Sequence, residues 1–398
     1  MSGTDPHKKN YRKPARSFEK SGYVDPAASY YVPFEHVVNS DGLDIKTMVD
    51  RGRYFSIFAP RQSGKTTFLE NFRGQLHEDP TYAALQLSFE RYKELDRRQF
   101  YEMIEEELYS QLIDRLTQVN CDKTEQVRHY LNGFHLDGPL AFGKLFGELN
   151  RIIQLKKIVI FIDEFDGIPP GELESFLTTL RDLYQRYKSV RQKALYSIGL
   201  VGIRNITRLV VGGVSPFNIA DQVEMPPFSF KNISDLFAQY SEETHQPFCE
   251  DAVKLVHDET RGQPWLVNRL ATILTVNVKP QTVEPIDEND VRKAIELLLN
   301  EKNTHFDNLY EKARLYKETF IEIVFDHVLY NPYVEDQGWL EQYGLIKNRD
   351  GHAAVANHIY QTMFTRIFFK EVETYREIPI QEGDKTVTSF TIGIGRPD

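Results

Sequence analysis

The sequence predicts an α/β fold: a parallel sheet flanked by helices, then a helical region, then a C-terminal winged-helix module. Two observations lead to this prediction. Up to Pro227, short apolar runs alternate with longer amphipathic stretches, which is typical of strands linked by crossover helices. After Pro227 the strand-like runs stop and helical patterns continue to about residue 330. The length of 398 residues suggests two or three domains.

Five strands are expected in the first half of the chain. Four runs are apolar on both faces, as expected for strands buried between two layers of helices. These runs are 54–59, 83–89, 158–162 and 198–203. A fifth, shorter strand is expected at 222–225, where Pro226 and Pro227 then end the pattern.

Helices are expected where apolar residues recur every three or four positions. In 99–116 an apolar residue recurs every four positions from Phe100 to Leu112, and 173–187 behaves similarly. Later in the chain, Ser229 suits a helix N-cap and Pro264 suits a first helical turn. The helices expected beyond Pro227 span 230–241, 249–259, 264–275, 287–300 and 304–330, with a linker at 276–285.

The predicted winged-helix module rests on a hairpin signal. Asp350 and Gly351 lie between two β-like runs, and this dipeptide favours a tight turn. The module comprises a short helix at 339–343 that ends at Gly344, β-like runs at 345–347 and 353–356, and a closing helix at 359–369.

These patterns divide the chain into five parts. The first is a basic N-terminal arm that lacks the apolar stretch of a secretory leader and is expected to be flexible. The parts are the arm (1–25), the α/β domain (26–228), a helical lid (229–300), the winged helix (301–370) and a polar C-terminal tail (371–398).

Composition excludes several classes of protein. A hydrophobic fraction of 41% is too high for a disordered chain, and no stretch of about 18 apolar residues could span a membrane. The only two cysteines, Cys121 and Cys249, do not make a disulfide scaffold and fit a reducing cytoplasm. With 48 basic and 58 acidic residues the net charge is −10, which disfavours a protein that coats nucleic acid.

The segment 59–66 (APRQSGKT) has the pattern of a phosphate-binding loop. It follows a predicted strand and opens a predicted helix, the context in which backbone N–H groups and a helix N-terminus hold an anion. Lys65 is expected to reach the β- and γ-phosphates, Thr66 to hold Mg²⁺, and Gly64 to leave room for phosphate. Ala59 replaces the first glycine of the motif. The remaining loop residues expected to contact nucleotide are Arg61, Gln62, Ser63 and Thr67.

A second part of the site follows the buried strand 158–162. The carboxyl end of such a strand faces the crevice where open α/β sheets bind ligands. Asp163 is expected to hold Mg²⁺, and Glu164 to orient or deprotonate the attacking water. An acidic turn that merely caps the next helix is the alternative, and the loop upstream favours the catalytic interpretation.

A third part is the end of the strand 198–203. Arg204, or secondarily Asn205, is placed to sense the γ-phosphate, although an arginine that simply leaves the strand into solvent fits as well. Arg181 and Arg208 are candidate arginine fingers across a subunit boundary. Together with Lys65 and Glu164, Arg204 completes the set of expected catalytic residues.

With these motifs the chain resembles the AAA-like ATP-binding proteins of prokaryotes. These proteins are similar to the STAND and origin-recognition branches of the additional-strand P-loop ATPases. The resemblance covers residues 20–370 and is carried by FSIFAPRQSGKTTFLENF (55–72), IVIFIDEFDGIP (158–169), YSIGLVGIRNI (196–206), SPFNIA (215–220) and TRGQPWLVNRLA (260–271).

The resemblance implies ATP and Mg²⁺ as cofactors and adds three assignments. Gly262-Gln263-Pro264 resembles the G-x-P motif with which the STAND lid contacts nucleotide, so Pro264 is expected in the site. The run Tyr30, Tyr31, Val32 and Pro33 stands where such proteins wrap the adenine. Arg204 resembles their sensor arginine.

Three functions follow from this resemblance, in order of preference. The first is an ATPase, expected to be slow, that acts as a nucleotide-driven conformational switch and signals to a protein partner. The second is a nucleotide-bound scaffold without turnover, which Ala59 in the loop makes credible. The third is a DNA-binding ATPase of the origin-recognition kind, disfavoured because 335–370 holds four acidic and four basic residues. Membrane binding is not expected, and a homo-oligomer is left open.

Overall fold

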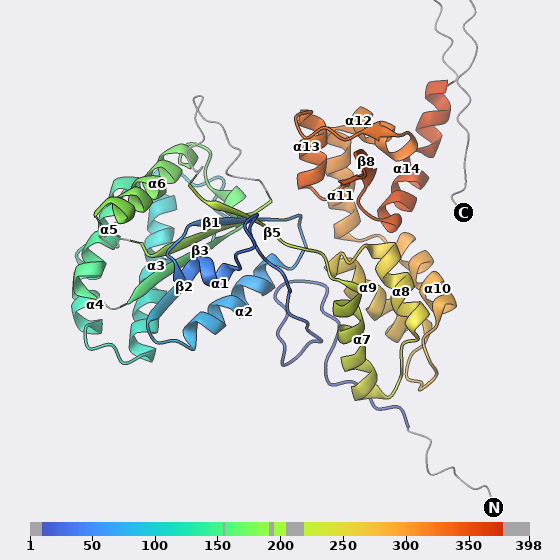
Figure 1. Ribbon diagram of the computed structural model, residues 1–398, viewed down its shortest axis with the longest axis horizontal. Coiled ribbons are helices and arrows are strands. Elements are labelled where there is room, and N and C mark those ends of the chain that lie inside the picture. Colours follow the sequence, from blue (N-terminus) through green and yellow to red (C-terminus); the bar gives the residue numbers. More distant parts are fainter. Residues whose placement is uncertain (1–9, 154–155, 191–194, 204–218, 377–398) are drawn as a thin grey trace, which may run out of the picture.

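A five-stranded parallel sheet forms the first half of the protein, and all five predicted strands are confirmed to within one residue or two (Figure 1). The computed structural model describes residues 10–153, 156–190, 195–203 and 219–376. The strand order is β2-β3-β4-β1-β5, so β4 lies between β1, which precedes the loop 59–66, and β3, which ends at Asp163. The strands are β1 (Phe55–Phe58), β2 (Tyr82–Ser88), β3 (Lys157–Asp163), β4 (Ser197–Gly202) and β5 (Asp221–Glu224).

The sheet is buried on both faces, as its apolar strands require. Along β3, Ile158, Ile160 and Ile162 join one hydrophobic cluster, while Val159 and Phe161 point to the cluster on the opposite face. This alternation follows from the two-residue period of a strand. One face is covered by α1 (Ile45–Asp50) and α2 (Lys65–His77), and the other by α3 (Arg97–Gln118), α4 (Thr124–Asn132), α5 (Pro139–Ile152) and α6 (Leu173–Val190).

The second half is mainly helical, and α7–α14 with their neighbours share one continuous hydrophobic cluster from Phe228 to Phe368. The predicted helix 304–330 is not continuous. It breaks at Tyr316, whose backbone leaves the helical region (φ −130°, ψ 43°). The helices that precede this break are α7 (Phe230–Thr244), α8 (Glu250–Thr260), α9 (Pro264–Ile273) with a π-helical turn at Leu274–Val278, α10 (Glu288–Leu299) and α11 (Thr304–Leu315).

The C-terminal elements contain the predicted hairpin. Asp350 and Gly351 both adopt positive φ, 50° and 84°, and join two antiparallel strands of a small three-stranded sheet. The order of that sheet is β6-β8-β7. The elements are α12 (Lys317–Phe325), β6 (Val328–Leu329), α13 (Glu335–Gln342), β7 (Ile346–Arg349), β8 (His352–Val355) and α14 (His358–Arg376).

The N-terminal segment differs from the flexible arm that the sequence suggested. Residues 10–18 run along α7, where Arg16 forms an ion pair with Glu243 at 3.1 Å, and the N–H of Val24 then donates to the Thr67 hydroxyl of α2 at 3.1 Å. Phe18 is buried, and its ring lies 4.7 Å from that of Tyr30 and 5.7 Å from that of Tyr240. Aromatic burial therefore holds this segment in place, and its basic composition hid that role.

No helix among the described residues is long and apolar enough to cross a membrane.

Candidate functional site

The loop 59–66 connects β1 to α2, as its sequence context predicts. Gly64 is the N-cap of α2 and lies in the left-handed region (φ 87°), which glycine adopts without strain. A Cβ atom there would lie 2.6 Å from the ring of Phe34. Ala59 shows no positive φ, and its N–H donates to the carbonyl of Gly202 at 3.2 Å. The backbone at position 59 therefore accepts alanine.

Lys65 is the buried cation of the loop. Its ammonium donates to the carbonyl oxygens of Ala59 at 3.0 Å and Pro60 at 2.8 Å. Burial lowers the pKa of this ammonium, whereas the nearby carboxylates of Glu164 and Asp163 raise it. An anion bound in the loop would favour the charged form, since opposite charge stabilises an ammonium.

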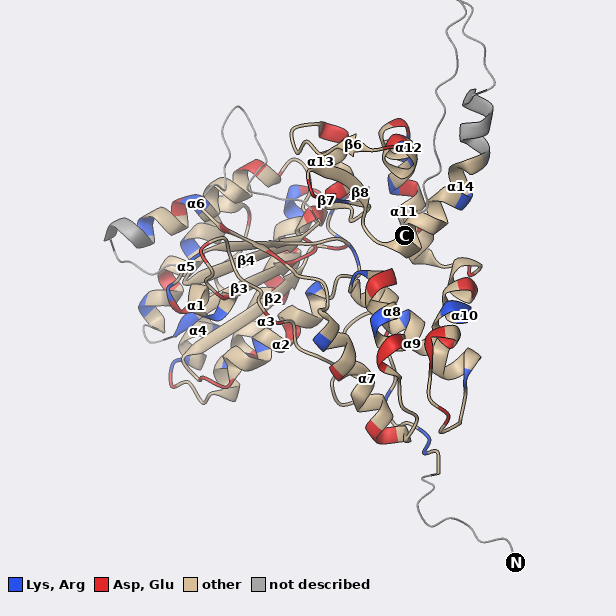
Figure 2. Ribbon diagram, turned by 45° about the vertical axis from the view of Figure 1, so that its right-hand side comes forward, with Lys and Arg blue, Asp and Glu red and all other residues tan. Residues whose placement is uncertain are grey.

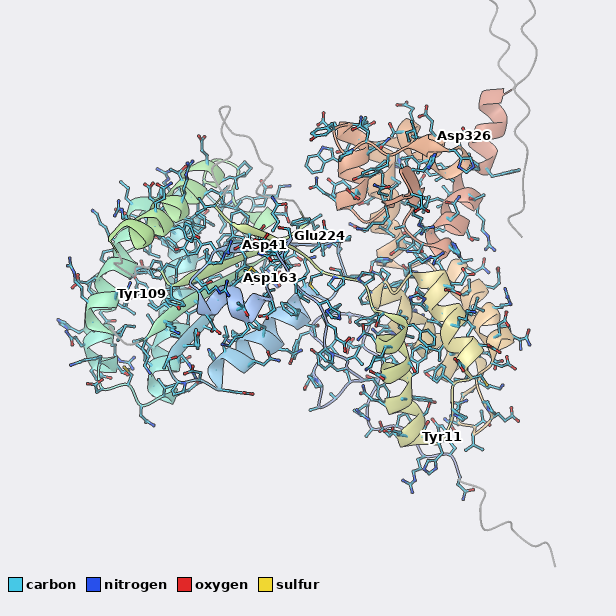
Figure 3. All side chains as sticks on the ribbon, viewed as in Figure 1. Tyr11, Asp41, Tyr109, Asp163, Glu224 and Asp326 are labelled. Atoms are coloured by element: carbon cyan, nitrogen blue, oxygen red, sulfur yellow. The ribbon has the colours of Figure 1, made fainter. Side chains whose placement is uncertain are left out.

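Asp163 and Glu164 lie beside the loop at the end of β3. Thr66 donates its hydroxyl hydrogen to Asp163 at 2.7 Å. Asp163, which Figure 3 labels at the sheet, is itself buried. The N–H of Glu164 donates to the other Asp163 carboxylate oxygen at 2.9 Å, with Glu164 in the left-handed region (φ 48°). Burial raises the pKa of Glu164, and the charge of Lys65 partly opposes this.

These side chains line one cavity of about 640 Å³. Three residues at the start of α11, namely Thr304, His305 and Asn308, also line it, although the sequence did not single them out. They come from the C-terminal half, so no local motif could have indicated them. The predicted site residues that the cavity brings together are Arg61, Gln62, Gly64, Lys65, Thr66, Thr67, Asp163 and Glu164.

The predicted adenine-binding run is only partly at the site. Tyr31 and Val32 line a small cavity of about 40 Å³ that also includes Gly64, Thr67 and Pro264. Gln239 of α7 fixes the backbone of Tyr31, because its side chain accepts from the Tyr31 N–H at 3.3 Å and donates to the Tyr31 carbonyl at 2.8 Å.

Two residues of this run lie differently from the rest. Pro33 is exposed and does not line the small cavity. Tyr30 lines the cavity but is mainly part of the aromatic cluster with the N-terminal segment.

The Gly-Gln-Pro turn at the start of α9 lies against the loop. Gln263 caps α9 through the N–H of Leu266 at 2.6 Å, and its amide donates to the carbonyl of Gln62 at 3.3 Å. Gly262 has positive φ (72°), and a Cβ atom there would lie 1.9 Å from the carbonyl oxygen of Phe228. Glycine is therefore required at this position.

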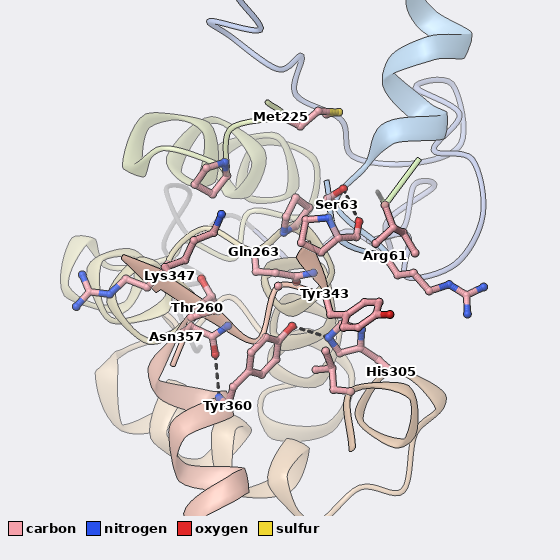
Figure 4. Close-up of a pocket in the computed structure, with 18 of the residues that line it drawn as sticks. Arg61, Ser63, Met225, Thr260, Gln263, His305, Tyr343, Lys347, Asn357 and Tyr360 are labelled. Carbon is pink, nitrogen blue, oxygen red and sulfur yellow. Dashed lines mark hydrogen bonds between the residues drawn. The ribbon is translucent and has the colours of Figure 1, made fainter. Parts of the chain in front are cut away.

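Several predicted residues fall elsewhere. The Ser63 hydroxyl donates to the Pro60 carbonyl at 2.8 Å and lines a second cavity behind the loop (Figure 4). Arg181 lies on α6 and lines none of the cavities around the loop. Arg204, Asn205 and Arg208 lie outside the described residues.

Comparison with known proteins agrees with this geometry. The family model for the AAA-like domain matches residues 20–366. The chain belongs to the AAA-like domain family. Its fold is similar to that of P-loop ATPases. None of the curated proteins matches the chain significantly.

Solved structures resemble this AAA-like protein at low sequence identity. A Walker-type ATPase of Pyrococcus abyssi is 11% identical, with a TM-score of 0.54, and the match covers 83% of this chain and 98% of that one. Cdc6p of Pyrobaculum aerophilum is 13% identical (TM-score 0.38, 80% and 88% covered). RuvB, the Holliday junction branch migration motor of Thermotoga maritima, is 13% identical (TM-score 0.39, 80% and 91% covered). The first of these supports the fold.

The side chains of the AAA-like protein fit a magnesium nucleotide. Thr66 and Asp163 place two oxygen atoms 2.7 Å apart beside the loop, and oxygen is the ligand that Mg²⁺ prefers. The tight contact of Gly64 with Phe34 leaves no room for a larger residue, and the loop is followed directly by the N-terminus of α2.

Proposed function

We propose that this AAA-like protein is a Mg²⁺-dependent ATPase that acts as a nucleotide-driven conformational switch. One observation supports the switch above all. The same phosphate loop touches both the Gly-Gln-Pro turn, through Gln62 and Gln263, and the C-terminal elements, through Pro60 and Gly344. A change in the loop therefore reaches both other parts of the protein directly.

We assign the residues of the site as follows. Lys65 contacts the β- and γ-phosphates, and Thr66 and Asp163 hold Mg²⁺, which neutralises phosphate charge when bound. Glu164 accepts a proton from water, a role that its raised pKa suits. Tyr31, Val32 and Pro264 contact the adenine side. Arg204 remains our candidate for the γ-phosphate sensor.

The contact between Gly344 and Pro60 is close. A Cβ atom on Gly344 would lie 2.5 Å from the Pro60 ring, so the Gly344 backbone approaches this ring as only glycine allows. A ligand moves an equilibrium only through contacts that differ between the two states. The loop contacts with Gln263 and Gly344 are the ones we expect to differ between the ADP and ATP states.

We further propose that residues 26–228 form the ATPase domain, 229–300 the lid and 301–370 a winged helix. The winged helix would transmit the nucleotide state to a protein partner. Four acidic and four basic residues lie between 335 and 370, and both signs are visible along the C-terminal elements in Figure 2. A DNA-reading surface would normally be basic. We therefore favour a protein partner, with slow hydrolysis setting the lifetime of each state.

The switch is tested with Lys65→Ala and the control Lys254→Ala, an exposed lysine on α8. We expect Lys65→Ala to lose ATP affinity by at least about a hundredfold, because a charge-assisted phosphate contact disappears. Small-angle scattering should give different curves for ADP and a non-hydrolysable ATP analogue in the parent and the control only. Unchanged ATP affinity in Lys65→Ala, or identical curves in the parent, would refute the proposal.

A further inference from the structure

A second cavity, of about 470 Å³, lies on the other side of the phosphate loop (Figure 4). We call it the basic cavity. Its walls come from the loop, from the segment after β5, from the ends of α8 and α9, and from the C-terminal elements. Its apolar walls are formed chiefly by Met225, Pro226, Pro227, Leu309, Tyr343 and Tyr360.

Five cationic side chains line this cavity, and none of its lining residues among the described part of the chain is acidic. This is unexpected in a protein of net charge −10. Within the described residues none of the five forms an ion pair with a carboxylate. The five cations are Arg61, Arg261, Lys312, Lys347 and Arg349.

Arg61 also lies near Glu164, whose pKa its charge lowers, whereas among the described residues the contacts of the other four cations involve no carboxylate. Arg349 donates to the carbonyl of Ala356 at 2.9 Å, and the Lys312 ammonium lies 5.1 Å from the ring centre of Tyr343. Burial lowers the pKa of Arg349, and the charge of Arg261 lowers it further. Like charges gathered at an apolar wall are unfavourable unless an anion joins them.

Two carboxylates lie close by and do not cancel this charge. Glu224 and Glu341 line a smaller adjoining cavity of about 80 Å³ that also includes Lys347. Glu341 already accepts a hydrogen bond from the hydroxyl of Tyr330 at 2.6 Å. Arg61 also lines the phosphate cavity with Glu164, so with both carboxylates ionised the other four cations face two anions across the two cavities.

We propose that the basic cavity binds a small organic anion with an apolar or aromatic body and at least two phosphate, sulfonate or carboxylate charges. Its volume falls in the range of small-molecule sites, which are concave, mostly apolar and equipped with a few convergent polar groups. Lys347 and Arg61 lie on opposite sides of it, and the Arg61 side chain extends away from the other residues drawn (Figure 4).

A concave small-molecule site fits these features better than a nucleic-acid surface. Two of the four basic residues between 335 and 370, Lys347 and Arg349, line the cavity. The rest of that region therefore carries four acids and two bases, which is unfavourable for contacts with a phosphate backbone.

Such a ligand would stabilise the arrangement shown here. It would touch the phosphate loop, the start of α9 and the C-terminal elements at once. Because a ligand favours the state to which it binds, it would hold these three parts together. This inference does not depend on ATP hydrolysis.

The test uses naphthalene-1,5-disulfonate, a rigid aromatic dianion, titrated by calorimetry into the full-length protein saturated with Mg-ADP. We expect one site. Lys312→Gln and Lys347→Gln should each weaken binding about tenfold, since each removes a charged contact. The control Lys254→Gln, on the exposed surface of α8, should bind like the parent. An unchanged affinity for Mg-ADP would show that the variants are folded.

Three further outcomes would overturn the proposal. The first is no saturable binding of the disulfonate at millimolar concentrations. The second is equal affinity for uncharged naphthalene-1,5-diol, which would indicate an apolar hollow only. The third is displacement of the disulfonate by a single-stranded oligonucleotide, which would indicate a nucleic-acid site. Binding that persists in Lys65→Ala without nucleotide would separate this site from the phosphate loop, so the two proposals can fail independently.

Discussion

Replacing Glu164 by glutamine should separate nucleotide binding from hydrolysis. Glu164 follows Asp163 at the end of β3 and lines the same cavity as Lys65. Glutamine keeps the size of the side chain and the backbone donor to Asp163, but it cannot accept a proton. The substitution therefore removes one chemical function and leaves the shape of the site.

The size of the effect follows from the role assigned to Glu164. A positioned general base contributes about 10²–10⁴ in rate, which corresponds to about 3–5 kcal/mol of activation free energy. We expect single-turnover ATP hydrolysis to fall by that factor in Glu164→Gln. ATP affinity should be unchanged or higher, because one carboxylate near the phosphates has lost its charge.

The pH dependence gives a second readout. Burial raises the pKa of Glu164, so the group takes up a proton at a higher pH than an ordinary glutamate. The base is active when deprotonated. The parental kcat/KM should therefore decline as the pH falls through this raised pKa, and Glu164→Gln should lose that limb.

Glu174→Gln is the matched control, because Glu174 is exposed in the first turn of α6 and outside the described cavities. Its hydrolysis rate should stay within about twofold of the parent. Two results would refute the reasoning: Glu164→Gln turning over ATP at the parental rate, or losing affinity and turnover by the same factor. The first would leave proton transfer to another group, and the second would indicate a structural role.

Three further predictions concern stability, measured by urea unfolding. Gly167→Ala would bring a Cβ atom to 1.9 Å from a backbone carbonyl oxygen, and we expect the free energy of unfolding to fall by about 1–3 kcal/mol. At Gly171 an added Cβ atom meets nothing within 4 Å, so Gly171→Ala should change the free energy of unfolding little. His305 is buried, and burial lowers its pKa to about 3. The unfolded chain therefore protonates His305 at a higher pH than the folded protein does, so the free energy of unfolding falls as the pH drops below about 6.5. His305→Phe should remove about 1.4 kcal/mol per pH unit of that slope, and an unaltered slope would contradict it. Phe18→Ala should lower the free energy of unfolding by about 3 kcal/mol if the N-terminal segment is part of the core, and should leave it almost unchanged if the segment is a free arm.

The sheet and the phosphate loop could be predicted because their signals are local. A buried parallel strand needs apolar residues on both faces, so runs such as 158–162 stand out against the helices around them. The loop residues 59–66 and the carboxylates after β3 each follow a strand directly. Parallel strands all end at one edge of the sheet, so the loop and these carboxylates are expected to lie close together. Thr66 and Asp163 do form a hydrogen bond there.

The remaining features depend on contacts between distant segments. Tyr30 and Tyr31 are adjacent aromatic residues, yet Tyr30 packs mainly on the N-terminal segment while Tyr31 lies beside the loop. His305 lines the phosphate cavity from a helix that begins more than 200 residues after the loop. No proline or glycine marks the break at Tyr316, which lies between two helices that pack on one core. Sequence spacing alone carries none of this information.

Packing also links the phosphate loop to the start of α9. Gly64 contacts the ring of Phe34, which lies 5.1 Å from the ring of Phe228. Phe228 donates its N–H to Gly262 at 2.8 Å, and its carbonyl approaches the same glycine so closely that no side chain fits. Each contact joins two groups that cannot move independently without opening a gap or a clash, and closely packed groups transmit such strain. A displacement of the loop by a bound phosphate must therefore either break this series of contacts or carry the start of α9 with it. The second keeps this series of contacts intact and so avoids the loss of packing that the first entails.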